Sequence, residues 1–365
     1  MNVVFRTDAS VQIGTGHVMR CLTLADALRE RGARCTFICR AHTGNLINLI
    51  RQRGYPVLEL PAQESQTVSI SPDSLKHAQW LGTDWVTDVK HTREALGSQV
   101  VDWLVVDHYA LDYQWEQALR PHCQHLMVMD DLADRAHDCD LLLDQNLGRT
   151  ELDYSPYLPL KVTTLIGPRY ALLRPEFGAL RATSLGRRTH PRIKRLLITM
   201  GGVDKANVTG DVLNALRNCT LPPDSHITVV MGTHAPWLNN IQATSQTMPW
   251  STQVLVNVNH MARLMAESDL IIGAAGGTVW ESCSLGLPSL VIALADNQRT
   301  GASALRKAGA ALTFENGLDV SALLQHLLNS DDHVFQLQQL STKAAAITQG
   351  NGAALVTQTL ERWHA

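Results

Sequence analysis

The sequence predicts an α/β protein built from two doubly wound, Rossmann-like domains. Short apolar segments alternate with amphipathic segments along most of the chain, and both halves open with a strand, a glycine-rich turn and a helix. At 365 residues, the chain also exceeds the usual size of one domain. Such a succession forms parallel sheets with right-handed crossovers. We therefore expect a ligand cleft between the two domains.

In the first half, short apolar runs predict buried parallel strands. They are Val3–Phe5, Cys35–Cys39, Pro56–Leu60, Trp103–Val106, Leu126–Met129 and Leu141–Leu143. His17–Arg31 carries its apolar residues on one helical face, and Gly32 follows as a stop signal. Gln63–Ser74 is polar and patternless, which fits a mobile loop at the cleft and an ordinary surface loop equally well.

The hydrophobic pattern lapses near Ile166–Pro175. Ser184–Arg195 is basic, contains Gly and Pro and lacks periodicity, which indicates an interdomain linker. The strands predicted beyond it are Leu196–Thr199, Ile227–Met231, Val254–Val256, Leu270–Gly273 and Ser289–Ala293. We expect an N-terminal domain over residues 1–180, a C-terminal domain over 190–345 and a final helix over 346–365 that returns toward the N-terminal domain.

Composition limits the classes of function. The formal charge of −3 gives no global electrostatic reason to bind nucleic acid or an acidic membrane, and no apolar stretch is long enough to span a bilayer. The chain starts on a strand-like segment and not on a signal peptide. The seven cysteines form no C-x-x-C pair and fit buried, reduced thiols. We expect a cytoplasmic protein without nucleic-acid or membrane partners; its oligomeric state stays open.

The first candidate site is the glycine-rich turn between the first strand and helix. Gly14 and Gly16 let the backbone turn sharply, and the helix N-terminus favours negative charge. The turn lacks a full G-x-G-x-x-G and the lysine of a P-loop, which disfavours a nicotinamide site. His17 follows at the positive helix end, so we expect a neutral imidazole that can accept a proton. A helix-capping or core histidine is the structural alternative.

The second candidate site is the strand, turn and helix of Gly273–Pro288. Backbone amides and the hydroxyl in Gly276-Gly277-Thr278 can hold a diphosphate. Glu281 is placed to bind a ribose diol, although a carboxylate in a first helical turn also simply favours the helix dipole. Met200-Gly201-Gly202 is a further, weaker glycine turn at the same sheet edge.

Polar groups also follow three predicted strands of the first half. Asp107-His108-Tyr109, Asp130-Asp131 and Asp144-Gln145-Asn146 should line one cavity with Asp8 and His17, because ligands bind beyond the carboxyl ends of parallel strands. Each group also fits a simple turn. Asp138-Cys-Asp140 resembles the D-x-D motif of metal-dependent glycosyltransferases, but it precedes its strand and lacks nearby ligands. We therefore expect no metal and no cofactor.

Together these segments resemble the GT-B architecture, and Gly273–Pro288 resembles the nucleotide-binding end of MurG-type glycosyltransferases. The chain resembles more closely the PseG family, the UDP-2,4-diacetamido-2,4,6-trideoxy-β-L-altropyranose hydrolases of pseudaminic acid biosynthesis. The motifs that carry this likeness are Arg6-Thr-Asp-Ala-Ser, Ile-Gly-Thr-Gly-His17-Val-Met-Arg, Val-Val-Asp107-His-Tyr109, Asp130-Asp131, Arg169-Tyr170-Ala-Leu-Leu-Arg-Pro-Glu-Phe and Met200-Gly-Gly-Val-Asp204. They are collinear with the family over nearly the full length.

The resemblance implies metal-independent hydrolysis of a UDP-sugar, in which water attacks C1 with inversion and releases UDP and the free sugar. It implies His17 as the base with Tyr109 beside it, backbone near Met261 at the uracil, Glu281 at the ribose, Gly276, Gly277 and Thr278 at the diphosphate, and Asn297 and Gln298 at the sugar. With the strand-end groups added, we expect Asp8 as a third catalytic residue and Arg6, Gly14, Gly16, Asp107, Asn146, Gly201 and Gly202 as further substrate-binding residues.

Three alternatives remain open. A glycosyltransferase of the same fold would pass the sugar to an acceptor, although no basic or apolar run between Thr43 and Lys90 suggests the membrane-facing patch that lipid acceptors require. A non-catalytic nucleotide-sugar binding protein would not need His17. A hydrolysing 2-epimerase would need a pair of acid/base carboxylates, for which Asp8 and Asp107 are candidates.

Overall fold

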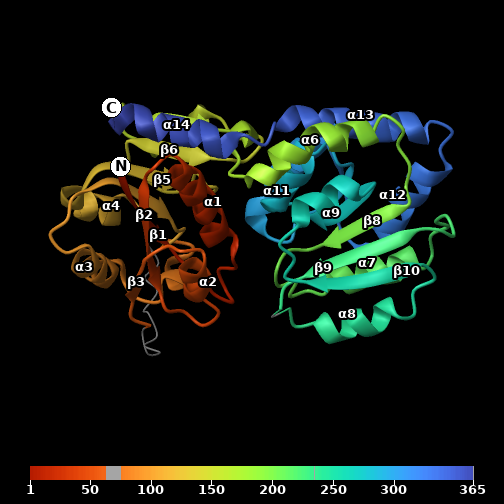
Figure 1. Ribbon diagram of the computed structural model, residues 1–365, viewed down its shortest axis with the longest axis horizontal. Helices are drawn as coiled ribbons and strands as arrows, with labels where there is room; N and C mark the ends of the chain where they lie inside the picture. The colour runs from red at the N-terminus through yellow and green to blue at the C-terminus, as the bar shows by residue number, and fades with distance from the viewer. Residues whose placement is uncertain (63–74, 234, 365) are drawn as a thin grey trace. The chain divides into compact units, whose positions relative to one another are not determined.

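The computed structural model describes residues 1–62, 75–233 and 235–364, so the loop expected at Gln63–Ser74 lies outside the described residues. The chain divides into two compact units (Figure 1). The first unit contains Met1–Leu172 together with the helix α14, Gly352–His364, and the second contains Leu173–Asn351. Each unit has its own parallel sheet.

The first unit is built on a seven-stranded sheet in the order β3-β2-β1-β4-β5-β6-β7. Its strands are β1 (Asn2–Thr7), β2 (Arg34–Arg40), β3 (Val57–Leu60), β4 (Val101–Asp107), β5 (Cys123–Met129), β6 (Leu141–Asp144) and β7 (Thr163–Ile166). All adjacent pairs are parallel. The strand order reverses between β1 and β4, and this switch point is where ligands of such sheets bind.

Helices cover both faces of this sheet. They are α1 (Gly16–Glu30), α2 (Ile47–Gln52), α3 (Trp85–Leu96), α4 (Tyr113–Leu119), α5 (Glu151–Tyr154) and α14, with short 3₁₀ segments at Ala78–Leu81, Arg120–His122 and Pro168–Tyr170. Phe5 packs with α1 and α14, whereas Val4 packs with α3 and α4. Because successive strand residues point to opposite faces, the apolar run of β1 serves two cores.

The second unit has a six-stranded parallel sheet in the order β10-β9-β8-β11-β12-β13. Its strands are β8 (Arg195–Thr199), β9 (His226–Met231), β10 (Ser251–Val256), β11 (Leu270–Ala274), β12 (Ser289–Ile292) and β13 (Leu312–Thr313). Its helices are α6 (Pro175–Arg187), α7 (Val208–Leu216), α8 (Leu238–Ser245), α9 (Met261–Glu267), α10 (Thr278–Ser284), α11 (Asp296–Lys307), α12 (Gly317–Asn329) and α13 (His333–Ile347). The switch point lies between β8 and β11.

The basic segment 184–195, which we predicted as the interdomain linker, is not one. Its first part is the end of α6 and its last residue opens β8, so all of it belongs to the second unit. Arg188 donates hydrogen bonds to the carbonyls of Met265 and Ser268, both at 3.2 Å, at the end of α9. A basic side chain there satisfies terminal helix carbonyls. The chain passes between the units at Leu172–Leu173, where the hydrophobic pattern lapses.

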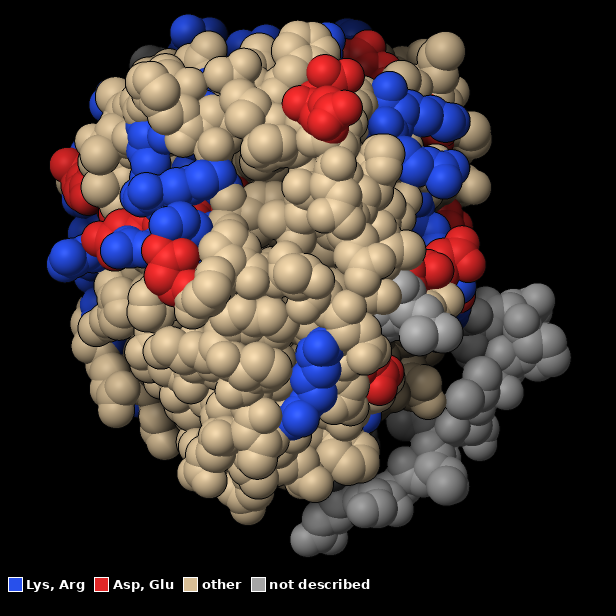
Figure 2. Space-filling view, turned by 90° about the vertical axis from the view of Figure 1, so that its right-hand side faces the viewer, with Lys and Arg blue, Asp and Glu red and all other residues tan. Residues whose placement is uncertain are grey.

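Charged side chains are mixed in sign on the face shown in Figure 2. Basic residues lie beside acidic ones there, and a broad part of that face carries few charges. Within the described residues, no helix combines the length and apolar character needed to cross a bilayer.

Candidate functional site

The first candidate site lies at the switch point of the first sheet. β1 leads into the Gly14–Gly16 turn and α1, and its neighbour β4 ends at Asp107. Thr7 and Asp107 are register partners at the ends of these two strands. Side chains that follow β1 and β4 therefore meet at one edge of the sheet.

His17 and Asp107 form a buried hydrogen-bonded pair at this edge. Nδ1 of His17 lies 2.5 Å from Oδ1 of Asp107. Burial alone would raise the pKa of Asp107, but the positive charge of Arg20 and the contact with His17 hold that pKa well below its usual range. The carboxylate is thus ionised and can accept a hydrogen bond from a protonated Nδ1. In a neutral imidazole, that arrangement leaves the lone pair on Nε2, which is the tautomer that a general base requires.

Arg20 holds Asp107 in place. Its Nε and Nη2 donate to the two carboxylate oxygens of Asp107, each at 2.7 Å, and its Nη1 donates to Oδ2 of Asp131 at 2.7 Å. A two-pronged contact of this kind fixes the plane of a carboxylate. We did not predict Arg20 as a site residue, although its position three residues after His17 places both on one face of α1.

Asp107, which we predicted to bind substrate, is fully buried. Both of its oxygens are engaged by His17 and Arg20. The role of Asp107 in the structure therefore differs from the one we predicted. Its carboxylate holds the ring of His17, and its side chain has no exposed surface that could contact a ligand.

Tyr109 stands beside His17, as expected from the sequence motif. The two ring centroids are 4.5 Å apart and the rings are nearly perpendicular, at 83°. The Tyr109 hydroxyl donates to Oδ2 of Asp131 at 2.5 Å. Burial, and then the charge of Asp131, raise the pKa of Tyr109 well above its usual value. The phenol keeps its proton and can orient a ligand, but it is no proton acceptor near neutral pH.

Asn146 lies on the other side of Asp131. Its Nδ2 donates to Oδ1 of Asp131 at 2.7 Å and to Oδ1 of Asp144 at 2.8 Å. Asp144 is fully buried and also accepts the hydroxyl of Tyr154 at 2.9 Å. Burial, and then the charge of Asp131, raise the pKa of Asp144 to about 7. One carboxylate, Asp131, thus joins Tyr109, Arg20 and Asn146.

Arg6 and Asp8, which we predicted to act on the substrate, lie in a buried ion-pair network. Both side chains are 0% exposed and lie 2.7 Å apart, and Arg6 also contacts Asp88 at 2.7 Å. Arg40 shares Asp88 at 2.5 Å, and its backbone N–H donates to Asp8 at 2.7 Å. Paired charges offset the large cost of burying each of them. The network joins β1, β2 and α3, so the role of Arg6 and Asp8 in this structure is to stabilise the fold.

Gly14 and Gly16 form an open turn before α1. Gly14 has a φ of +85°, which other residues rarely adopt, and its N–H donates to the Ser10 carbonyl at 2.8 Å. Among the residues that the structure describes, a Cβ at either glycine would meet no atom within 4 Å. Thr15, the N-cap residue, makes no side-chain cap, and the first turn of α1 contains no acidic residue. The turn thus leaves space and uncapped amides for a ligand.

The second candidate site lies at the switch point of the second sheet. The neighbouring strands β8 and β11 lead into Gly201-Gly202 and Gly276-Gly277. Gly201 and Gly202 are exposed, and Gly201 has a φ of +84°. A Cβ on Gly232 would lie 2.2 Å from the Gly202 carbonyl oxygen, so a glycine is required at position 232 to let that turn fit.

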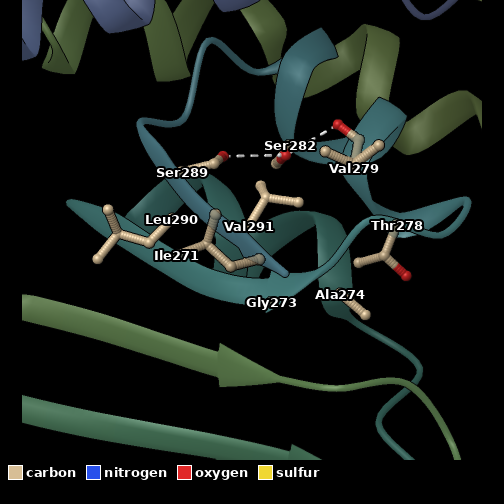
Figure 3. Close-up of a pocket in the computed structure, with 9 residues that line it drawn as sticks. All are labelled: Ile271, Gly273, Ala274, Thr278, Val279, Ser282, Ser289, Leu290 and Val291. Carbon is tan, nitrogen blue, oxygen red and sulfur yellow. Dashed lines mark hydrogen bonds between the residues drawn. The ribbon is translucent and has the colours of Figure 1, made fainter. Parts of the chain in front are cut away.

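Gly276, Gly277 and Thr278 form the turn into α10. Figure 3 shows a small pocket beneath this helix, with the Thr278 hydroxyl pointing away from the other lining residues. The lining residues are Ile271, Gly273, Ala274, Thr278, Val279, Ser282, Ser289, Leu290 and Val291. Ser289 donates to Ser282 at 3.3 Å, and Ser282 to the Val279 carbonyl at 2.9 Å. The pocket is mostly buried packing space, whereas the outward Thr278 hydroxyl is available to a ligand.

Glu281 lies one turn into α10 with its side chain 21% exposed. Burial raises its pKa to about 7, although Arg174 opposes this shift. Nη2 of Arg174 lies 4.0 Å from Oε1 of Glu281, and its Nη1 donates to the Asn259 carbonyl at 3.4 Å. Arg174 therefore links Glu281 to the segment just before Met261, the half-buried first residue of α9. We did not predict Arg174 as a site residue.

Asn297 and Gln298 lie in the first turn of α11. Asn297 is exposed, and Oε1 of Gln298 accepts the backbone N–H of Leu294 at 2.9 Å. A Cβ on Gly276 would lie 3.6 Å from Nε2 of Gln298. The structure thus brings Gln298 to the Gly276 turn.

The D-x-D-like pair Asp138 and Asp140 is engaged by a cation. Nη1 of Arg120 lies 2.6 Å from Asp140, and its Nε lies 3.5 Å from Asp138. Asp140 also accepts the backbone N–H of Leu126 at 2.7 Å. These contacts give both carboxylates a structural explanation.

The C-terminal half of the chain is similar to a known family of domains. Residues 197–359 match the model of the glycosyltransferase family 28 C-terminal domain. The chain is 27% identical over 304 residues to an uncharacterised protein of Methanocaldococcus jannaschii, an alignment that covers 82% of this chain and 57% of the relative. It is 25% identical over 309 residues to the UDP-2,4-diacetamido-2,4,6-trideoxy-β-L-altropyranose hydrolase of Campylobacter jejuni, covering 85% of this chain and 97% of that protein.

Among solved structures, the chain is similar to MurG of Acinetobacter baumannii. The TM-score is 0.69 at 17% sequence identity, and 99% of each chain is covered. Two parallel α/β units and this likeness confirm the predicted fold: the protein has the GT-B fold with two Rossmann-like domains.

Proposed function

We propose that this protein hydrolyses a UDP-linked 2,4-diacetamido-2,4,6-trideoxy sugar to UDP and the free sugar, with inversion at C1. The observation that carries this proposal is the pair His17–Asp107, held by Arg20, because it leaves Nε2 of His17 ready to accept a proton. The similarity to the Campylobacter jejuni hydrolase along 97% of that protein supports the choice of substrate.

In the proposed reaction, His17 acts on water. The water oxygen bonds to C1 on the face opposite UDP while Nε2 of His17 takes a water proton. The bond between C1 and the UDP oxygen breaks, and its electron pair leaves with the diphosphate. Asp107 stabilises the imidazolium that forms, and Tyr109 orients the sugar beside it.

The second unit supplies the UDP contacts in this proposal. Backbone amides of Gly276, Gly277 and Thr278 and the Thr278 hydroxyl bind the diphosphate, and they stabilise its developing charge as the bond breaks. Glu281 accepts hydrogen bonds from the ribose diol. Backbone near Met261 meets the uracil.

Incubating the purified protein with the UDP-sugar, EDTA and no acceptor tests this function. We expect stoichiometric release of UDP and free sugar, and NMR should show the inverted anomer first. UDP release that requires an added acceptor would overturn the hydrolase proposal. It would favour a glycosyltransferase, the second candidate, which the match to the glycosyltransferase family 28 C-terminal domain supports.

UDP affinity should increase as the pH rises through about 7, the value to which burial raises the pKa of Glu281. Below that pH the carboxyl is protonated and accepts ribose hydroxyls poorly; above it, the carboxylate accepts both. Calorimetry at pH 6 and pH 8 measures the effect. Glu281→Gln should bind UDP more weakly at pH 8 and lose the part of the pH dependence that is not due to the UDP phosphate. An unchanged pH profile in that variant would exclude Glu281 as the ribose ligand.

A further inference from the structure

The side-chain amide of Asn146 is held in one orientation. Its NH₂ group donates to two carboxylates, Asp131 at 2.7 Å and Asp144 at 2.8 Å. The reverse orientation would lose both of these hydrogen bonds and place the amide oxygen against an oxygen of the Asp131 carboxylate, so the observed orientation is favoured. Within residues 1–62, 75–233 and 235–364, no side chain or backbone group donates to the Asn146 oxygen. The half-buried Asn146 therefore offers a fixed acceptor to a ligand.

An aromatic cluster lies next to this acceptor. The hydroxyl of Tyr109 and the amide of Asn146 bind the two oxygens of the same carboxylate, Asp131, so these side chains are neighbours. The ring of Trp80 stacks on Tyr109 with centroids 5.6 Å apart, and His77 lies 4.3 Å from Trp80 and 5.5 Å from Tyr109. Trp80 and His77 are half-buried. They present apolar ring surface beside a polar site.

We propose that Asn146 and Trp80, which stacks on Tyr109, form a subsite for the N-acylamino group at C2 of the sugar. The amide N–H of that group donates to Oδ1 of Asn146, and its acyl methyl lies on the half-buried ring of Trp80, which stacks on the buried Tyr109. A hydroxyl could satisfy the acceptor but would leave the aromatic surface uncovered, so the pair of features selects an acylamino group over a hydroxyl. This inference rests on the proposed function in that it takes a UDP-sugar as the ligand.

The test compares two probes, UDP-N-acetylglucosamine and UDP-glucose, which differ in an acetamido group and a hydroxyl at C2. Calorimetry gives the Kd of each probe and of UDP. The unaltered protein should bind the acetamido probe about 10-fold to 100-fold more tightly than the hydroxyl probe. Asn146→Ala and Trp80→Ala should each reduce that ratio at least several-fold and leave the Kd of UDP unchanged.

Thr150→Ala is the matched control. Thr150 lies four residues beyond Asn146 and caps α5 through a capping box with Asp153, which does not include Asn146. This variant should keep the ratio, which shows that loosening the loop is not enough to change it. A ratio near 1 in the unaltered protein, or an unchanged ratio in Asn146→Ala, would overturn the subsite. Because the readout is binding, a protein that shows the ratio but hydrolyses neither the probes nor the diacetamido sugar would contradict the hydrolase proposal and leave the subsite standing.

Discussion

Replacing His17 with glutamine is expected to lower kcat for UDP-sugar hydrolysis by about 10²–10⁴-fold, the usual contribution of a positioned general base. Glutamine keeps a polar side chain of similar length, but it offers no basic nitrogen to accept the proton from water. The Kd of UDP should stay unchanged, because its proposed ligands lie in the other unit. Steady-state kinetics and calorimetry on the same preparation measure both quantities.

His122→Gln is a suitable control for this variant, since His122 lies just before β5, at the opposite end of the strands from His17. It should retain full activity. A His17→Gln protein with normal kcat would exclude His17 as the base. If UDP binding and the unfolding midpoint fell together with activity, His17 would be a structural residue.

Replacing Asp88 with alanine is expected to lower the free energy of unfolding by about 3–5 kcal/mol, more than the loss of a helix cap. Asp88 is fully buried and pairs with both Arg6, at 2.7 Å, and Arg40, at 2.5 Å. It also accepts the indole N–H of Trp115 at 3.0 Å. Without this carboxylate, Arg6 keeps Asp8 as its partner, whereas the buried guanidinium of Arg40 loses its ion pair and keeps its hydrogen bond to the Pro61 carbonyl.

Denaturant unfolding of Asp88→Ala and Asp84→Ala provides the comparison. Asp84 is the N-cap of the same helix, α3, and accepts the backbone N–H of Thr87 at 2.9 Å. Removing that cap should cost about 1 kcal/mol. Equal losses in the two variants would mean that the buried network contributes no more than a helix cap.

The fold could be predicted from the sequence, because most strands of the two sheets are buried on both faces and therefore appear in the sequence as apolar runs. The helix predicted at His17–Arg31 is α1, Gly16–Glu30. The short strands β7 and β13 were missed, since a half-buried run such as Thr163–Ile166 has little hydrophobic contrast with its surroundings.

The site was predicted less well, because strand ends specify where a backbone lies but not which side chains pair. Arg6 and Asp8 are near the carboxyl edge, yet their buried side chains pair with each other, and Arg6 also pairs with Asp88, which is distant in sequence. Asp107 could be placed at the edge, but its contact with Arg20 spans 87 residues. Such long-range ion pairs leave no local pattern in the chain.

The central claim is that water attacks C1 of the sugar, and hydrolysis in ¹⁸O-labelled water tests it most directly. Mass spectrometry of the two products shows where the label goes. If His17 activates water for attack at C1, the free sugar gains one ¹⁸O and UDP gains none. Label in UDP would mean attack at phosphorus, and it would contradict the proposed reaction.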